Sequence, residues 1–219
     1  MLNRLKRQLN VTDWLLLIMV GVYLDFTICG GTANPENLIR FGAKADPLIQ
    51  QGQWWRLITP IFLHLNFTHI LFNGITLYFL GIQIERWLGH WRYLLLFMIS
   101  GVVGNSTSFA FNSDLSAGAS GAIFGLLGAF IMIGIVGWQN QQIRSMTKVF
   151  SGFILLNLAT DVMTTGIDVA NHLGGLLAGF LISWCLGVPG VKSNRKVQIL
   201  ALLGLIIFEI VVLNYGFES

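Results

Sequence analysis

The chain has 219 residues, of which 54% are hydrophobic and only 11% are charged. A soluble domain carries about 25% charged residues because its surface must face water. The composition therefore argues against a soluble enzyme, and a net charge of +3 is too small to suggest a nucleic-acid partner. Most of the exterior is expected to face lipid.

Seven stretches are apolar enough to cross a bilayer as helices, which takes about 20 residues each. In chain order they cover residues 12–29, 66–84, 93–111, 119–138, 148–165, 169–187 and 197–214. The sequence thus predicts an all-α, polytopic membrane bundle. The first stretch is longer than a signal-peptide core and has no small-residue cleavage site, so we expect it to be retained.

The basic residues between the spans predict an orientation. With the N-terminus in the cytoplasm, ten of the 13 Lys and Arg residues lie inside, and only Arg40, Lys44 and Arg56 lie outside. Basic residues are retained on the cytoplasmic side during insertion. The predicted location is a bacterial plasma membrane with a cytoplasmic N-terminus.

The one long external connection covers residues 30–65 and is rich in Trp, Pro and Gly. Trp54 and Trp55 suit the headgroup region, where amphipathic aromatic side chains are favoured. A connection of this length more often carries function than a simple link does. We therefore expect an ordered segment.

Polar side chains inside the spans are the main functional signal, because each is costly in hydrocarbon. In the predicted orientation, the second, fourth and sixth spans begin at the outer face. His69, Asn73, Ser120 and His172 then lie within about 10 Å of the outer ends of their helices, at 1.5 Å per residue. The sequence predicts that these four groups share one layer.

Serine and histidine in one layer suit nucleophilic catalysis. Ser120 can attack a carbonyl if neutral His172 accepts its proton. His69 and Asn73 lie at i and i+4, so both can donate hydrogen bonds to an oxyanion. The plainer alternative for each of these two is an interhelical hydrogen bond.

Small residues in the fourth and sixth spans allow the close helix approach that a Ser–His pair needs. The candidates are Gly118, Gly121 and Gly175, although generic bundle packing also uses such glycines.

Acidic residues do not complete a triad at this stage. Asp168 lies four residues before His172, but Asp is favoured at helix N-termini, and we favour that role, which leaves a Ser–His dyad. Asp161 and Asp168 are expected in the outer loop, which argues against an aspartyl protease. No His-Glu-x-x-His pair is present, so neither a metal nor another cofactor is expected. Cys29 and Cys185 fall at opposite faces, too far apart for a disulfide.

Several motifs in this order resemble the rhomboid protease family, over residues from about 53 to 187. The family's Gly-x-Ser-Gly nucleophile motif is matched by Gly118-Ala119-Ser120-Gly121. Its Ala-His-x-x-Gly motif is similar to the run from Asn171 to Gly175. Its second-helix His-x-x-x-Asn motif is matched by His69 and Asn73. Its Trp-Arg pair is matched by Trp55 and Arg56, and its Glu followed by Gly is matched by Glu85 and Gly89.

The resemblance implies a six-helix core, residues 12–187, that holds a Ser–His dyad in a water-accessible cavity below the outer surface. Residues 1–11 would be a cytoplasmic segment, and residues 188–219 a linker with an additional seventh transmembrane helix. The substrate would be a transmembrane protein, cut within or next to its span. Two positions depart from the family. Phe124 stands where Tyr is common, and the resemblance implies that its ring still packs in the site by stacking on His172. Asn171 stands where Ala is common.

Other functions remain open from the sequence. One is a catalytically inactive relative that binds transmembrane clients, although such proteins typically lack the nucleophile or the base. A transporter or channel would place its polar groups nearer the midplane and would show internal repeats, which are not evident here. The oligomeric state is left open.

Overall fold

The computed structural model describes residues 9–31, 34–164, 166–192 and 194–218. Residues 1–8, which hold most of the predicted cytoplasmic N-terminal segment, lie outside these ranges. Seven long helices run through the described residues: α1 (Val11–Ile28), α4 (Phe67–Leu88), α5 (His90–Phe111), α6 (Ser120–Val136), α7 (Gln141–Met163), α8 (Val169–Leu186) and α9 (Arg195–Glu218).

Within the described ranges the chain has helices and no strands, apart from one isolated β-bridge. Six of the long helices are long and apolar enough to cross a membrane, and α6 is apolar but shorter, at 17 residues. The predicted all-α membrane bundle is confirmed, and the chain is an integral membrane protein.

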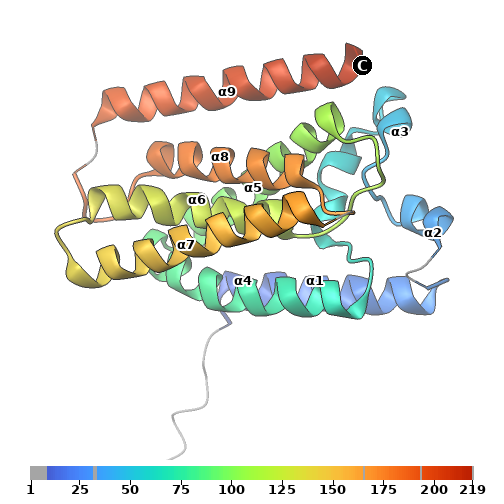
Figure 1. The fold of residues 1–219 in the computed structure, drawn as a ribbon, viewed down its shortest axis with the longest axis horizontal. Coiled ribbons are helices and arrows are strands. Elements are labelled where there is room, and N and C mark those ends of the chain that lie inside the picture. Colours follow the sequence, from blue (N-terminus) through green and yellow to red (C-terminus); the bar gives the residue numbers. More distant parts are fainter. Residues whose placement is uncertain (1–8, 32–33, 165, 193, 219) are drawn as a thin grey trace, which may run out of the picture.

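Helix α6 lies at the centre of the bundle, with α5 and α8 packed against it. Figure 1 shows α9 along one edge and α1 with α4 along the other, with α5, α6 and α8 between them. The largest hydrophobic cluster is built around α6, most of whose side chains are buried. The candidate residues Ser120 and Phe124 therefore come from the most enclosed helix.

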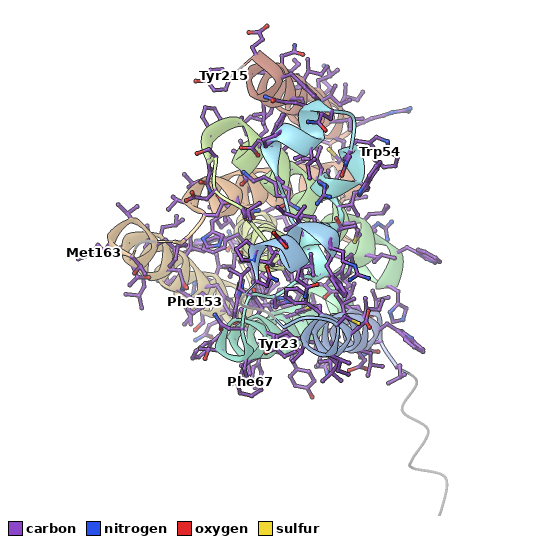
Figure 2. All side chains as sticks on the ribbon, turned by 90° about the vertical axis from the view of Figure 1, so that its right-hand side faces the viewer. Tyr23, Trp54, Phe67, Phe153, Met163 and Tyr215 are labelled. Atoms are coloured by element: carbon purple, nitrogen blue, oxygen red, sulfur yellow. The ribbon has the colours of Figure 1, made fainter. Side chains whose placement is uncertain are left out.

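The outer surface of the bundle is apolar, as a lipid-facing protein requires. In the most apolar 18-residue windows of α7 and α9 only 17% of residues are buried, against 67% in α5. Figure 2, viewed toward the end that carries α2 and α3, shows α7 standing apart on one side, with Met163 near its tip. Phe153 and Met163 are both exposed on this helix.

Helix boundaries differ from the predicted spans where capping and glycine decide them. Helix α7 begins seven residues before the predicted residue 148, because the Asn140 side chain accepts hydrogen bonds from the Gln142 and Ile143 backbone N–H groups. Helix α4 continues beyond predicted residue 84 to Leu88 and stops at Gly89, whose φ of 80° suits glycine.

The carboxylate of Glu85, near the end of α4, holds the start of α1. It accepts hydrogen bonds from the Val11 N–H at 2.7 Å, the Thr12 N–H at 2.9 Å and the Thr12 hydroxyl at 2.6 Å. His90 Nδ1 also contacts Glu85. Free N–H groups at a helix start need such partners. The motif residue Glu85 therefore joins α1 to α4 at the end opposite the candidate site.

The segment between α1 and α4, which was predicted to be external and is called the external segment below, is ordered over its described residues, as predicted. It consists of α2 (Pro35–Arg40), α3 (Asp46–Gln50) and two 3₁₀ turns, η1 (Trp54–Leu57) and η2 (Thr59–Phe62). The buried Arg56 side chain donates to the carbonyl oxygens of Ile39 at 2.8 Å and Ala43 at 2.9 Å. Arg56 thus fixes the path of this segment, which gives the arginine of the Trp-Arg motif a structural role.

The same segment supports the connection that leads into α6. Lys44 and Ser116 form the isolated antiparallel bridge, and the Gly118 N–H donates to the Pro60 carbonyl at 2.9 Å. The ammonium group of Lys44, whose side chain is fully buried, pairs with Asp46 at 2.8 Å. Residues 112–119 are therefore held against the external segment just before Ser120.

Candidate active site

Ser120 is the first residue of α6, two positions after Gly118. Gly118 has a φ of 140°, a conformation that residues with a side chain rarely adopt. A β-carbon at Gly118 would lie 2.8 Å from His69 Nε2 and 3.8 Å from Ser120 Oγ. Only glycine fits here, and its absent side chain lets the His69 ring approach the start of α6.

Helices α6 and α8 approach each other backbone to backbone. A β-carbon on Gly175 would lie 2.0 Å from the Gly121 carbonyl oxygen, and one on Gly179 would lie 2.0 Å from that of Gly125. Real side-chain contacts are never this short, so neither position accepts even alanine without the helices separating. The predicted packing role of Gly121 and Gly175 therefore has a direct geometric basis.

The start of α8 is fixed to α5 by two polar contacts. The Asp168 carboxylate accepts from the Asn171 backbone N–H at 3.0 Å and also from the Ser108 hydroxyl. Asp168 is thus an N-cap, as predicted. The Asn171 side chain donates to Asn105 Oδ1 at 2.7 Å, which accounts for the unusual residue at this position. These contacts fix the rotation of α8 one residue before His172.

The imidazole of His172 is held on two sides. Its ring stacks on Phe124 with centroids 4.3 Å apart and planes 14° apart. Its Nδ1 lies 2.7 Å from Oδ2 of Asp161, and both side chains are buried. A phenyl ring at position 124 is sufficient for this stacking, and the role of Phe124 in an active site stays a prediction. The contact with Asp161 was not predicted.

Sequence reasoning placed Asp161 in the outer loop, and this was wrong. Asp161 lies in the last turn of α7 and is 7% exposed. The three buried residues of α7 are Thr147, Ile154 and Asp161, spaced seven apart and therefore on one helix face. The seven-residue spacing could have revealed this in the sequence, because it places the Asp161 carboxylate on the face of α7 that packs against the other helices.

Ser120 and His172 line one cavity of about 130 Å³ between α4, α6, α7 and α8. The other lining residues are Phe72, Asn73, Thr76, Ile123, Phe124, Leu127, Phe153 and Asn157. The Ser120 hydroxyl makes no hydrogen bond to any described residue, so the pair shares a cavity without a formed bond. Catalytic contacts often tighten only when substrate binds.

Of the two predicted oxyanion donors on α4, Asn73 is among the residues that line this cavity and His69 is not. Asn73 lines the cavity, and one of its amide hydrogens is donated to the His69 carbonyl at 2.9 Å. The His69 ring lies against Gly118 and meets the ring of His64 edge-on, with centroids 5.1 Å apart. The oxyanion role of both residues stays a prediction.

His64 was not singled out from the sequence and is the most enclosed histidine. It is fully buried before the start of α4, and neither ring nitrogen has a hydrogen-bond partner among the described residues. Burial lowers the pKa of His64 to about 3, with a smaller contribution from nearby His69. His64 is therefore neutral at physiological pH, next to the candidate oxyanion donor.

Comparison with known proteins places the chain in a family. The family model of the Rhomboid domain matches residues 51–189. Rhomboid protease GluP of Bacillus subtilis (strain 168) is 37% identical over 202 residues, which are 92% of this chain and 39% of that protein. Rhomboid-like protease 1 of Toxoplasma gondii is 38% identical over 80% of this chain and 60% of its own length. RHOMBOID-like protein 5 of Arabidopsis thaliana is 37% identical over 68% of this chain and 49% of its own length.

These relatives are longer proteins, so the chain spans only part of each. Two of the three are named as proteases. The matched residues extend from the external segment to just beyond α8, and they include every candidate site residue.

Proposed function

This chain belongs to the rhomboid family, and from that premise we propose that it is an intramembrane serine endopeptidase with Ser120 as nucleophile and His172 as general base. The observation that carries the proposal is the shared cavity, which Ser120 and His172 line from the first turns of two helices in backbone contact. Catalysis needs such a fixed spacing between nucleophile and base.

In the proposed reaction, His172 accepts the Ser120 proton as the hydroxyl oxygen attacks the scissile carbonyl. The resulting tetrahedral oxyanion accepts hydrogen bonds from the Ser120 backbone N–H, which is free at a helix start, and from His69 and Asn73. His172 then donates its proton to the leaving amine. A water molecule releases the acyl group in a second, similar step.

The proposed substrates are transmembrane proteins. Supporting this, the cavity is lined by Phe72 of α4 and Phe153 of α7, both on helices whose outer faces are apolar and exposed. A peptide bond arriving from the bilayer between these two helices would meet Ser120 without crossing an aqueous surface. The described part of the fold therefore favours a membrane-embedded substrate over a soluble one.

The proposal is tested by cleavage of a model single-span membrane protein with purified wild-type chain, Ser120→Ala and His172→Ala. A fluorophosphonate probe, which reacts with activated serine, provides a second measurement. We expect cleavage and labelling in the wild type and loss of both in each variant. A wild type that neither cuts nor labels across several substrates and detergents would favour the alternative, an inactive protein that binds transmembrane clients.

We also propose a plasma-membrane location with the N-terminus inside and the site opening outward, supported by the distribution of basic residues. Two native cysteines test this. Cys29 is exposed at the C-cap of α1, and Cys185 lies in the last turn of α8. A membrane-impermeant maleimide applied to intact cells should label Cys29 and spare Cys185. The reverse pattern would invert the topology.

A further inference from the structure

We propose that Asp161 is a positioning residue for His172: its carboxylate accepts the Nδ1 proton and thereby leaves Nε2 as the basic nitrogen for Ser120. The proposal rests on the function proposed above and adds a third member to the dyad. It follows from the contact between the last turn of α7 and the first turn of α8.

Burial makes a partner for the Asp161 carboxylate necessary. Asp161 is 7% exposed inside a membrane bundle, where an unpaired carboxylate is costly. Its only ion-pair partner among the described residues is His172, at 2.7 Å between Oδ2 and Nδ1. That distance is a hydrogen bond of ordinary length, and both groups are shielded from competing water.

Two contacts together determine the state of the imidazole. Stacking on Phe124, with planes 14° apart, sets the plane of the His172 ring. The Asp161 contact sets the rotation of the ring within that plane and its tautomer, since a carboxylate can only accept a hydrogen bond at Nδ1. The proton is then on Nδ1, and Nε2, which has no hydrogen-bond partner among the described residues, keeps its lone pair available for Ser120 in the cavity that both residues line.

The other nearby acid is already committed elsewhere. Asp168 caps α8 through the Asn171 N–H and accepts from the Ser108 hydroxyl. Its backbone carbonyl accepts from the His172 N–H, which is the ordinary helical bond and leaves the ring untouched. The two acids therefore have different roles: Asp168 fixes the backbone of α8, and Asp161 fixes the His172 ring.

A purely structural role for Asp161 predicts different behaviour. Asp161 is also one of three buried residues that attach α7 to the bundle. If it only held α7 in place, its loss would alter the entry of membrane substrates and leave the chemistry of Ser120 intact. A small soluble probe that reaches Ser120 from water separates these two possibilities.

The first experiment compares Asp161→Ala with Ile154→Ala in the full-length chain. Ile154 is also buried on α7, two turns earlier, and does not line the cavity. We expect Asp161→Ala to slow fluorophosphonate labelling and to lower the kcat of cleavage by about 10- to 100-fold, with KM little changed. Ile154→Ala should affect labelling less than threefold. Asp161→Glu, which keeps the carboxylate, should recover part of the lost rate.

Three results would overturn the proposal: unchanged labelling in Asp161→Ala, lost cleavage with normal labelling, or equal losses in Asp161→Ala and Ile154→Ala. If Asp161→Ala fails to fold, Asp161→Asn replaces it, because it keeps the side-chain shape and removes the charge.

The second experiment needs no activity, so it separates this proposal from the proposed function. Nitrogen-15 NMR of histidine-labelled chain in detergent, with His172→Ala to assign the signal, reports which ring nitrogen carries the proton. We expect the proton on Nδ1 in the wild type and a mixture of tautomers in Asp161→Asn. A proton on Nε2 in the wild type would refute the positioning role, even if the protein proves active.

Discussion

Helices α5, α6 and α8 form a closely packed half of the bundle, whereas α7 is attached along a single face. In the closely packed half, glycines bring backbones into direct contact and amide side chains bridge α5 and α8. On α7 three side chains are buried, other hydrophobic side chains such as Phe150 and Leu158 are only partly buried against the core, and 17% of its apolar window is buried. His172 belongs to the first half, and its Asp161 partner belongs to the second.

This difference shows which distances the fold holds constant. The separation of Ser120 and His172 is set by helix backbones, which have no rotamers to relax. The position of Asp161 depends on how α7 sits against the bundle. Ser120 and His172, the proposed nucleophile and base, are thus fixed within the close half, and the orientation of the His172 ring depends on the other half. Four predictions test this comparison.

The largest effect is expected where backbones touch. Gly175→Val places carbon atoms within about 2.0 Å of the Gly121 carbonyl oxygen, so α6 and α8 must separate. We expect a loss of about 3 kcal/mol or more in stability, measured by thermal unfolding in detergent. Gly152→Val on α7, where nothing lies within 4 Å, should change stability by less than about 0.5 kcal/mol. Equal effects would remove the distinction between the two halves.

The next largest effect is a pH dependence of stability that arises from His64, which is buried just before the start of α4. Its pKa is lowered to about 3 in the folded chain and is about 6.5 when unfolded, so only the unfolded chain binds the proton between these values. Stability is therefore full above pH 6.5 and falls as the pH decreases toward 3, by about 2 kcal/mol between pH 8 and pH 5.

Replacing His64 tests that pH dependence directly. His64→Phe should flatten the stability-against-pH curve in this range relative to the wild type, as measured by chemical unfolding at each pH. Curves of equal slope in both proteins would show that His64 is already charged or hydrated in the folded state.

A smaller effect is expected from the amide contact between α5 and α8. Asn171→Ala removes the hydrogen bond to Asn105 and should cost about 1 kcal/mol, since amide contacts between membrane helices are worth about that much. Asn157 on α7 is the matched control, because its amide donates to the Phe153 carbonyl of its own helix. Asn157→Ala should change stability by less than about 0.3 kcal/mol. Equal losses of stability in Asn171→Ala and Asn157→Ala would contradict the distinction between the closely packed half and α7.

The smallest effect is expected from Phe124→Tyr, which installs the residue common in the family. The ring would still stack on His172, so we expect the labelling rate to change less than about threefold. Phe124→Ala removes the stacked ring and should slow labelling by about 10-fold. A large gain from Tyr would mean that the hydroxyl has a role that stacking does not supply.

The glycines and the four polar candidates could be selected from the sequence because their spacing along the helices indicates which of them share a face or a depth. Gly118, Gly121 and Gly175 permit approaches that no other residue permits, and each lies within three positions of Ser120 or His172. Orientation derived from Lys and Arg then placed these groups in one layer. Hydrophobic length likewise defined the seven helices, although capping by Asn140 moved one boundary by two turns.

The contact of Asp161 with His172 was not predicted because it forms across the connection between two helices. Asp161 lies eleven positions before His172, on a different helix. Sequence spacing alone does not show that the two side chains meet across the connection between α7 and α8. Helices α2 and α3 escaped for another reason: at six and five residues they are too short for a periodic pattern. Both features depend on contacts between distant segments.

Helix α6 has a further consequence because it is short. Its 17 residues span about 26 Å, less than the hydrocarbon thickness of about 30 Å, and the connection before it rests on Lys44 and Pro60. In the proposed orientation, we expect protein rather than lipid to lie above Ser120. We then expect the tilt of α7 and α9, which expose apolar side chains, to accommodate a thicker or thinner bilayer while the depth of Ser120 stays constant. Membranes of different thickness would thus change how substrate reaches the site more than the site itself.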